Sequence, residues 1–191
     1  MVETAWQAVT LCLQRDILNG FVNLHHDERL LDLLNSVSIN WLESRRRFLA
    51  LSNVIVKHTD GTEERMPAAY INKVAVHLAV MWHSDLGRGI GAKAGKRPYP
   101  FVEKLPVPVS VRLQLFSLMG RMHCASGQNP WHVLEEQLMF LPLTNVEVRP
   151  LSDDSWSDVP FVAVNREQIL SLQEEETPLL QVQSSQPEPL G

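Results

Sequence analysis

The chain has 191 residues, of which 45% are hydrophobic and 20% are charged, a composition typical of globular proteins. A chain of this length can bury a real core in one or two domains, so composition and length exclude a wholly disordered protein, a collagen and a coiled coil. Seventeen Lys and Arg residues against 22 Asp and Glu residues give a formal net charge of −5. Broad surfaces for nucleic acid or anionic lipid need excess positive charge, and this balance argues against both.

The first residues set the expected compartment. Glu3 is acidic and no basic stretch leads into an apolar run, so the segment does not resemble a secretory signal. The longest apolar stretch, 74–82, is far shorter than the roughly 20 residues of a membrane-spanning helix. Cys12 and Cys124 are the only cysteines, too few for a disulfide framework. We therefore expect a cytoplasmic protein with no membrane span.

Two strands are expected near the N-terminus, over 9–13 and 17–22. The second contains Gly20, which follows an asparagine and on that ground alone would indicate a tight hairpin turn. Its counterpart later in the chain, Gly120, follows a methionine, which has no such preference. We therefore predict that each glycine lies inside a strand, at a bend or bulge. The turn between the two strands is then expected near 14–16.

A short helix is predicted after each glycine-containing strand. Asp27 can cap a helix over 28–34, whose leucines recur at helical spacing. In the second half of the chain Asn129 is the expected cap, and Pro130 occupies the first helical position ahead of 131–137.

Residues 39–47 have no counterpart in the second half. The sequence INWLESRRR predicts a short helix that carries a tryptophan and a run of arginines. Because Trp and Arg are enriched among interface anchors, Trp41, Arg45 and Arg46 are candidate partner-binding residues. The alternative interpretation is a helix whose tryptophan packs on its own core while the arginines remain in solvent.

The clearest repeat is a strand that occurs twice. Residues 48–56 read FLALSNVIV and residues 140–148 read FLPLTNVEV, and six of the nine positions are identical. Both segments are apolar on alternate residues and rich in β-branched side chains, which is typical of a strand.

A further match follows in the same order, although the turn before it differs. An Asp-Gly pair at 60–61 predicts a hairpin turn in the first half only. Residues 70–76, YINKVAV, resemble residues 163–169, AVNREQI, because each has an asparagine and then a basic residue before an apolar segment. Since internal repeats decide the fold, we interpret the chain as a tandem duplication of one unit, residues 5–82 and 106–173.

The segments outside the two units have biased compositions. The linker, 83–105, is rich in Gly and Pro. The tail, 174–191, is acidic and rich in Pro, Ser and Gln, so we expect the tail to be disordered. Positive charge gathers in the linker, and this basic loop is either a solvated connection or a contact for an acidic or phosphate-rich partner. The candidate partner-binding residues here are Arg88, Lys93, Lys96 and Arg97.

Each unit is therefore expected to run strand–strand–short helix–strand–strand, with room for a fifth strand. A unit of about 70 residues has a thin core when alone, so the two copies are expected to pack together. Similar units that pack on each other tend toward the arrangement of an isologous dimer. We predict a β-rich α+β fold with pseudo-two-fold symmetry.

The alternating strand, the glycine-containing strand and the FLxLxNVxV strand together resemble an uncharacterised bacterial family of small β-rich domains. The resemblance covers most of both copies and implies a β-rich domain with no known activity. The bent glycine strand is also weakly similar to Sm-like small barrels.

No catalytic, cofactor-binding or metal-binding residue is predicted. The GRGIGA sequence at 87–92 matches a dinucleotide fingerprint, but prolines follow it closely and no helix or βαβ unit can be drawn after it. The seven histidines show no H-x-x-x-H spacing, and no G-x-S-x-G motif is present. Neither cysteine lies in a recognisable catalytic frame.

The preferred hypothesis is a non-catalytic protein-binding or assembly module built from two fused β-rich units. One alternative is a nucleic-acid-binding protein that uses small-barrel surfaces and the basic loop. A second is an enzyme whose site lies in the groove between the repeats.

Overall fold

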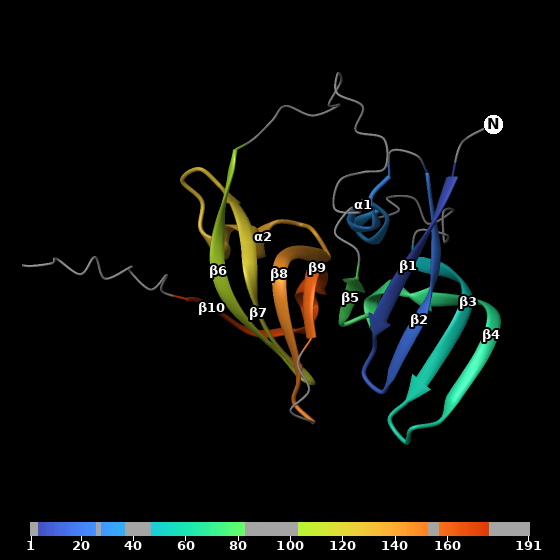
Figure 1. Ribbon diagram of the computed structural model, residues 1–191. Coiled ribbons are helices and arrows are strands. Elements are labelled where there is room, and N and C mark those ends of the chain that lie inside the picture. Colours follow the sequence, from blue (N-terminus) through green and yellow to red (C-terminus); the bar gives the residue numbers. More distant parts are fainter. Residues whose placement is uncertain (1–3, 26–27, 37–46, 83–102, 153–156, 176–191) are drawn as a thin grey trace, which may run out of the picture.

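The computed structural model describes residues 4–25, 28–36, 47–82, 103–152 and 157–175. In these ranges the chain is β-rich, as predicted, with ten strands in one antiparallel sheet and two short α-helices (Figure 1). Neither helix in these ranges has the length and apolar character needed to cross a membrane. The elements are β1 (Thr4–Cys12), β2 (Asp16–His25), α1 (Leu30–Asn35), β3 (Phe48–His58), β4 (Glu63–Asn72), the 3-10 turn η2 (Lys73–Ala75), β5 (Leu78–Met81), β6 (Lys104–Leu113), β7 (Phe116–Ala125), α2 (Pro130–Glu135), β8 (Phe140–Pro150), β9 (Ser157–Asn165), the 3-10 turn η4 (Arg166–Gln168) and β10 (Ile169–Glu174).

The strand order in the sheet is β10-β6-β7-β8-β9-β5-β1-β2-β3-β4. Strands of the first half of the chain (4–82) and of the second half (103–175) therefore occupy separate ends of the sheet. They meet at one joint, where β5 pairs with β9. This leaves β4 and β10 as the two edge strands, at opposite ends of the molecule (Figure 1).

Both predicted strand glycines lie at bulges. The register between β2 and β3 shifts beside Gly20, and the register between β7 and β8 shifts beside Gly120. The bulged residues of the facing strands, Asn53 and Asn145, have positive φ angles of 51° and 50°. A Cβ atom on Gly120 would lie 3.0 Å from Cγ2 of Val146, so any larger residue at this bulge would force the Val146 side chain to move.

The two predicted turns are also confirmed. Between β1 and β2 the N–H of Leu13 donates to the carbonyl of Asp16 at 2.9 Å. Between β3 and β4, Gly61 has a φ of 84°, a conformation that glycine adopts without strain.

The helix boundaries differ from the sequence prediction. Asp27 lies outside the described residues, and α1 begins only at Leu30, with Arg29 as the N-cap. The carboxylate of Asp32 accepts hydrogen bonds from the guanidinium of Arg29 at 2.7 and 2.8 Å, which holds the first turn together. In α2 the predicted N-terminus is confirmed, because the Asn129 side chain accepts the N–H of His132 at 3.2 Å.

Three further boundaries are corrected. Helix α2 ends at Glu135, short of the predicted end of 131–137. Strand β6 begins at Lys104, inside the segment expected to be linker, because it pairs with β7 from its first residue. Similarly β10 extends to Glu174, the first residue of the expected tail.

Each half has its own hydrophobic core, and the two cores lie on opposite faces of the sheet. At the central joint, Leu78 of β5 and Val162 of β9 face the second-half core. Their neighbours Ala79 and Ala163 face the first-half core. Side chains alternate between the faces of a strand, so each half curls around its own core on a different side of the sheet.

Candidate functional site

The candidate residues chosen from the sequence are not placed by the structure. All of them lie outside the described residues: Trp41, Arg45, Arg46, Arg88, Lys93, Lys96 and Arg97. The site that the structure does present lies in the second half, between α2 and β10.

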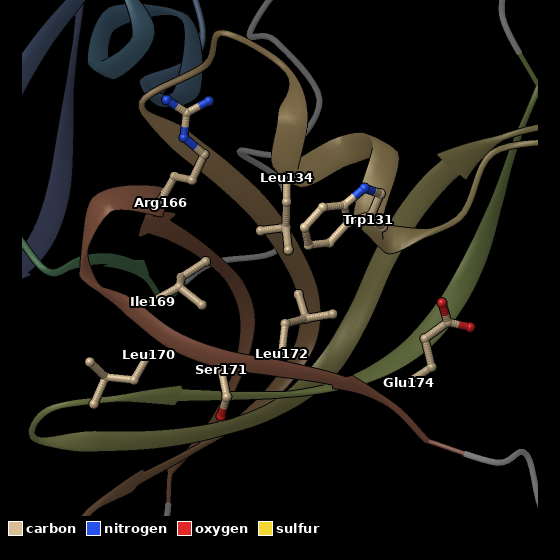
Figure 2. Close-up of a pocket in the computed structure, with 8 residues that line it drawn as sticks. All are labelled: Trp131, Leu134, Arg166, Ile169, Leu170, Ser171, Leu172 and Glu174. Carbon is tan, nitrogen blue, oxygen red and sulfur yellow. The ribbon is translucent and has the colours of Figure 1, made fainter.

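This site is a groove of about 480 Å³ (Figure 2). Trp131 and Leu134 project from α2 toward β10, and Leu172 of β10 faces them across the groove. The remaining lining residues are Arg166, Ile169, Leu170, Ser171 and Glu174. The floor is thus apolar, and one charged side chain lies toward each end.

A short network fixes α2 above β10. The side chain of Asn165, at the end of β9, accepts the N–H of Glu167 at 3.1 Å and caps η4. Arg166 then donates to the carbonyl of Glu136, the C-cap residue of α2. A cation is favourable at this place because the carbonyls at the end of a helix carry partial negative charge.

The groove borders an open sheet edge. In the described part of the chain β10 pairs with β6 alone, so one side of the strand keeps backbone N–H and C=O groups that no neighbouring strand uses. Leu170 and Trp131 are 68% and 62% exposed. Such an edge is a template for another strand unless it is covered.

The first half contains the same local arrangement. Asn72 caps η2 by accepting the N–H of Val74 at 3.2 Å, as Asn165 caps η4. Lys73 donates to the carbonyl of Leu33 near the end of α1, as Arg166 does at the end of α2. The space between α1 and β5 therefore corresponds to the groove between α2 and β10.

In the first half, however, this space is filled by the other half of the chain. Phe140, the first residue of β8, is fully buried in the first-half core. Its backbone is held by Asn35 of α1, whose amide donates to the Phe140 carbonyl at 2.9 Å and accepts the Phe140 N–H at 2.8 Å. Strand β9 lies beside β5, with Ala163 opposite Ala79.

The central joint is reinforced by Asn165, which has no exposed surface. Its backbone N–H donates to the carbonyl of His77 at 2.9 Å, and its side-chain amide donates to the carbonyl of Val76 at 2.8 Å. A strand and an aromatic side chain from the second half thus occupy the position that, beside β10, is filled by none of the described residues.

The groove residues were not predicted from the sequence. The repeat relates Phe48 to Phe140, but nothing in the two matching segments indicates that Phe48 is 41% exposed and Phe140 buried. One available signal was the segment 169–174, ILSLQE, which is separated by two residues from the Asn-Arg pair at 165–166 and carries three apolar residues in its first four positions.

A second, more polar pocket of about 520 Å³ lies between the two halves, where the enzyme alternative placed a site. Its titratable residues are Arg15, Asp16 and His77. Asp16 accepts a hydrogen bond from His58 at 2.7 Å, so its carboxylate is already engaged. His77 is 5% exposed, burial lowers its pKa, and its Nδ1 has no hydrogen-bond partner in the described part of the chain.

Because burial lowers the pKa of His77, we expect the free energy of unfolding to depend on pH. Burial also lowers the pKa of His123, which lies near Lys104 and Arg121. Below the ordinary histidine value of 6.5 the unfolded chain therefore binds more protons than the folded chain, and the free energy of unfolding falls as the pH falls. We expect this loss between about pH 7 and pH 5 in urea unfolding at fixed ionic strength.

His77→Gln and His123→Gln should each flatten part of this slope, and the double variant should flatten more than either. An unchanged slope in the double variant would show that neither imidazole is kept neutral by the fold.

The remaining candidate groups for chemistry are buried thiols. Burial raises the pKa of Cys12 to about 12 and also raises the pKa of Cys124, so both thiols stay protonated at neutral pH. Among the described residues, no three His, Cys, Asp or Glu side chains gather in a way that could hold a metal ion.

Comparison of the chain with family models, curated proteins and solved structures finds no significant match.

Proposed function

We propose that the chain is a non-catalytic protein-binding or assembly module, and that it receives an extended segment of a protein partner at β10. The observation that carries the proposal is the open β10 edge beside the apolar groove. The corresponding place in the first half holds a strand and a phenylalanine. Backbone pairing along the edge would supply affinity, and an apolar anchor in the groove would supply specificity.

The proposal includes a common origin for the two halves, each a β-rich α+β unit. The support for a common origin is that the same residues recur at the same bulge in both halves. Both bulges have an asparagine with φ near 50°, and both second strands carry a glycine there. Pro67 of β4 and Pro160 of β9 lie at the same position relative to these bulges.

We propose that the units are related by a half-turn combined with a shift along the sheet. Each unit contributes five strands in the same spatial order, and neighbouring strands are antiparallel throughout. Corresponding strands lie five places apart, and because direction alternates from strand to strand, each runs opposite to its counterpart. The hydrophobic cores of the two units also lie on opposite faces of the sheet. A half-turn about an axis that crosses the strands produces both reversals. This screw relation differs from the isologous pseudo-two-fold arrangement expected from the sequence, because the central joint pairs two strands, β5 and β9, that do not correspond in the two units.

The proposed function is tested by photo-crosslinking in cells that naturally produce the protein. The photo-reactive residue p-benzoylphenylalanine replaces Trp131 in the groove or, as a matched control, Trp6 of β1. The two tryptophans are 62% and 60% exposed. We expect a discrete polypeptide adduct from position 131 and none from position 6.

Leu172→Arg, which places a charge in the groove, should reduce the adduct at position 131 at least about tenfold. Absence of an adduct at position 131, or equal adducts at both positions, would contradict the proposal.

A further inference from the structure

We infer that the occupant of the groove is β4 of a second copy of the same chain, with Phe48 as the anchor. This inference rests on the proposed function and names its partner. Two copies would join head to tail through the geometry that already joins the two halves within one chain. The central joint between β9 and β5 is therefore the template for the contact between β4 and β10.

The register of the intermolecular pair follows from the internal one. In the central joint Ala163 lies opposite Ala79. Asn72 lies opposite Phe48, and Asn165 lies opposite Phe140, so the two asparagines correspond. Tyr70 and Ala163 each lie two residues before their asparagine, and they therefore correspond as well. Leu172 corresponds to Ala79, because each pairs with the same position of the neighbouring strand, in β6 and in β1. Tyr70 of one copy thus lies opposite Leu172 of the other.

Phe48 has the position from which it could fill the groove, as Phe140 fills the corresponding space in the first half. Each is the first residue of its strand, and each lies opposite the capping asparagine of the next strand. Phe140 is buried beside α1, whereas Phe48 is 41% exposed on β3, the strand next to the edge strand β4. With β4 paired to β10, Phe48 would enter the groove beside Trp131 and Leu134 of α2.

The strands that enter the two joints, β9 and β4, present similar sets of side chains. In the central joint, β9 presents Phe161 and Ala163 toward the first-half core. At the corresponding positions β4 presents Ala68 and Tyr70, so each strand supplies one aromatic residue and one alanine, in exchanged places. Tyr70 is 79% exposed in the single chain, and pairing with β10 would cover it.

The polar groups of the joint also have counterparts. The Asn165 amide donates across the central joint to the carbonyl of Val76. Asn72 has the corresponding position on β4, and the carbonyl of Ile169 corresponds to that of Val76. In the described part of the chain the Asn72 side chain uses its oxygen to cap η2, and its amide nitrogen has no acceptor. That nitrogen is available to the second copy.

One chain cannot make this contact with itself. Strands β4 and β10 end the same ten-stranded sheet at opposite sides, and the two cores curl away on opposite faces (Figure 1). The contact is heterologous, since it joins two different surfaces. It therefore leaves one free edge on each terminal copy, and growth continues unless a ring closes.

The test is the mass of the purified full chain in sedimentation, from about 1 μM to about 1 mM. We expect the wild-type mass to rise with concentration. Phe48→Ser should raise the dissociation constant at least about tenfold, because it removes the anchor. Phe21→Ser is the matched control, since Phe21 is 40% exposed but lies on β2, away from both edges.

Mixing variants distinguishes a head-to-tail contact from a self-complementary one. Phe48→Ser removes the anchor and keeps the groove, whereas Leu172→Arg blocks the groove and keeps the anchor. Each variant alone should stay largely monomeric at the concentration where half of the wild type is associated, with circular dichroism confirming that it is folded. The equimolar mixture should form dimers and nothing larger, because only one productive contact remains.

A wild-type chain that stays monomeric up to about 1 mM would overturn the inference. So would a mixture that fails to form dimers, or a Phe21→Ser variant that associates as poorly as Phe48→Ser. The crosslinking at position 131 separates the two proposals. A Leu172-dependent adduct with a different polypeptide keeps the proposed function and overturns the second copy as occupant, whereas absence of any adduct overturns both.

Discussion

Phe140→Ala is expected to lower the free energy of unfolding by about 3–5 kcal/mol, the range for deleting a fully buried aromatic side chain. The ring is buried in the first-half core although the residue belongs to the second half of the chain. Its loss leaves a cavity beneath α1, whose Leu30 and Leu34 are buried in the same core. Urea unfolding at low protein concentration measures the effect.

The matched control is Phe48→Ala, which makes the same change at the same position of the repeated strand. Because Phe48 is 41% exposed, we expect a loss of about 1 kcal/mol or less in the single chain. Hydrogen exchange should show lost protection in α1 and β5 for Phe140→Ala, although both elements precede the substitution by many residues. Equal losses for the two variants would mean that the second half does not complete the first-half core.

Local sequence was sufficient for the strands and their irregularities. Alternation and β-branching predicted β3 and β8, and comparison of Gly20 with Gly120 placed both glycines inside strands rather than in turns. These features depend on neighbours along the chain or on one adjacent strand. The start of α1 was predicted wrongly, because its N-cap residue is Arg29, and arginine is not among the residues that usually occupy this position.

The groove could not be predicted in the same way. Phe48 and Phe140 have nearly the same local sequence, and only the position of each strand in the sheet decides which one is buried. Trp131 and Leu172 come together because Arg166 holds the end of α2 above β10, a contact between segments distant in sequence. The candidates chosen from composition, such as Trp41 and Arg88, lie outside the described residues.

Asn165→Ala is expected to lower the free energy of unfolding by about 3 kcal/mol. The variant loses the cap on Glu167 and leaves the carbonyl of Val76 without its donor at a buried joint, and each buried unsatisfied group costs about 1–3 kcal/mol. Asn72→Ala, the matched control, loses only the cap on Val74 and should cost about 1 kcal/mol. Urea unfolding of both variants against the wild type is the measurement.

Aspartate at the same two positions separates the donor from the cap. Asn165→Asp keeps the oxygen that accepts from Glu167 but turns a carboxylate toward the carbonyl of Val76, so it should destabilise the chain at neutral pH and recover partly as acid protonates it. Asn72→Asp keeps its cap and faces no carbonyl in the single chain, so its unfolding should match that of the wild type. If Asn72 donates to β10 of a second copy, Asn72→Asp weakens self-association without changing the stability of the monomer. Equal destabilisation by the two aspartates would mean that the Asn165 amide contributes nothing across the central joint.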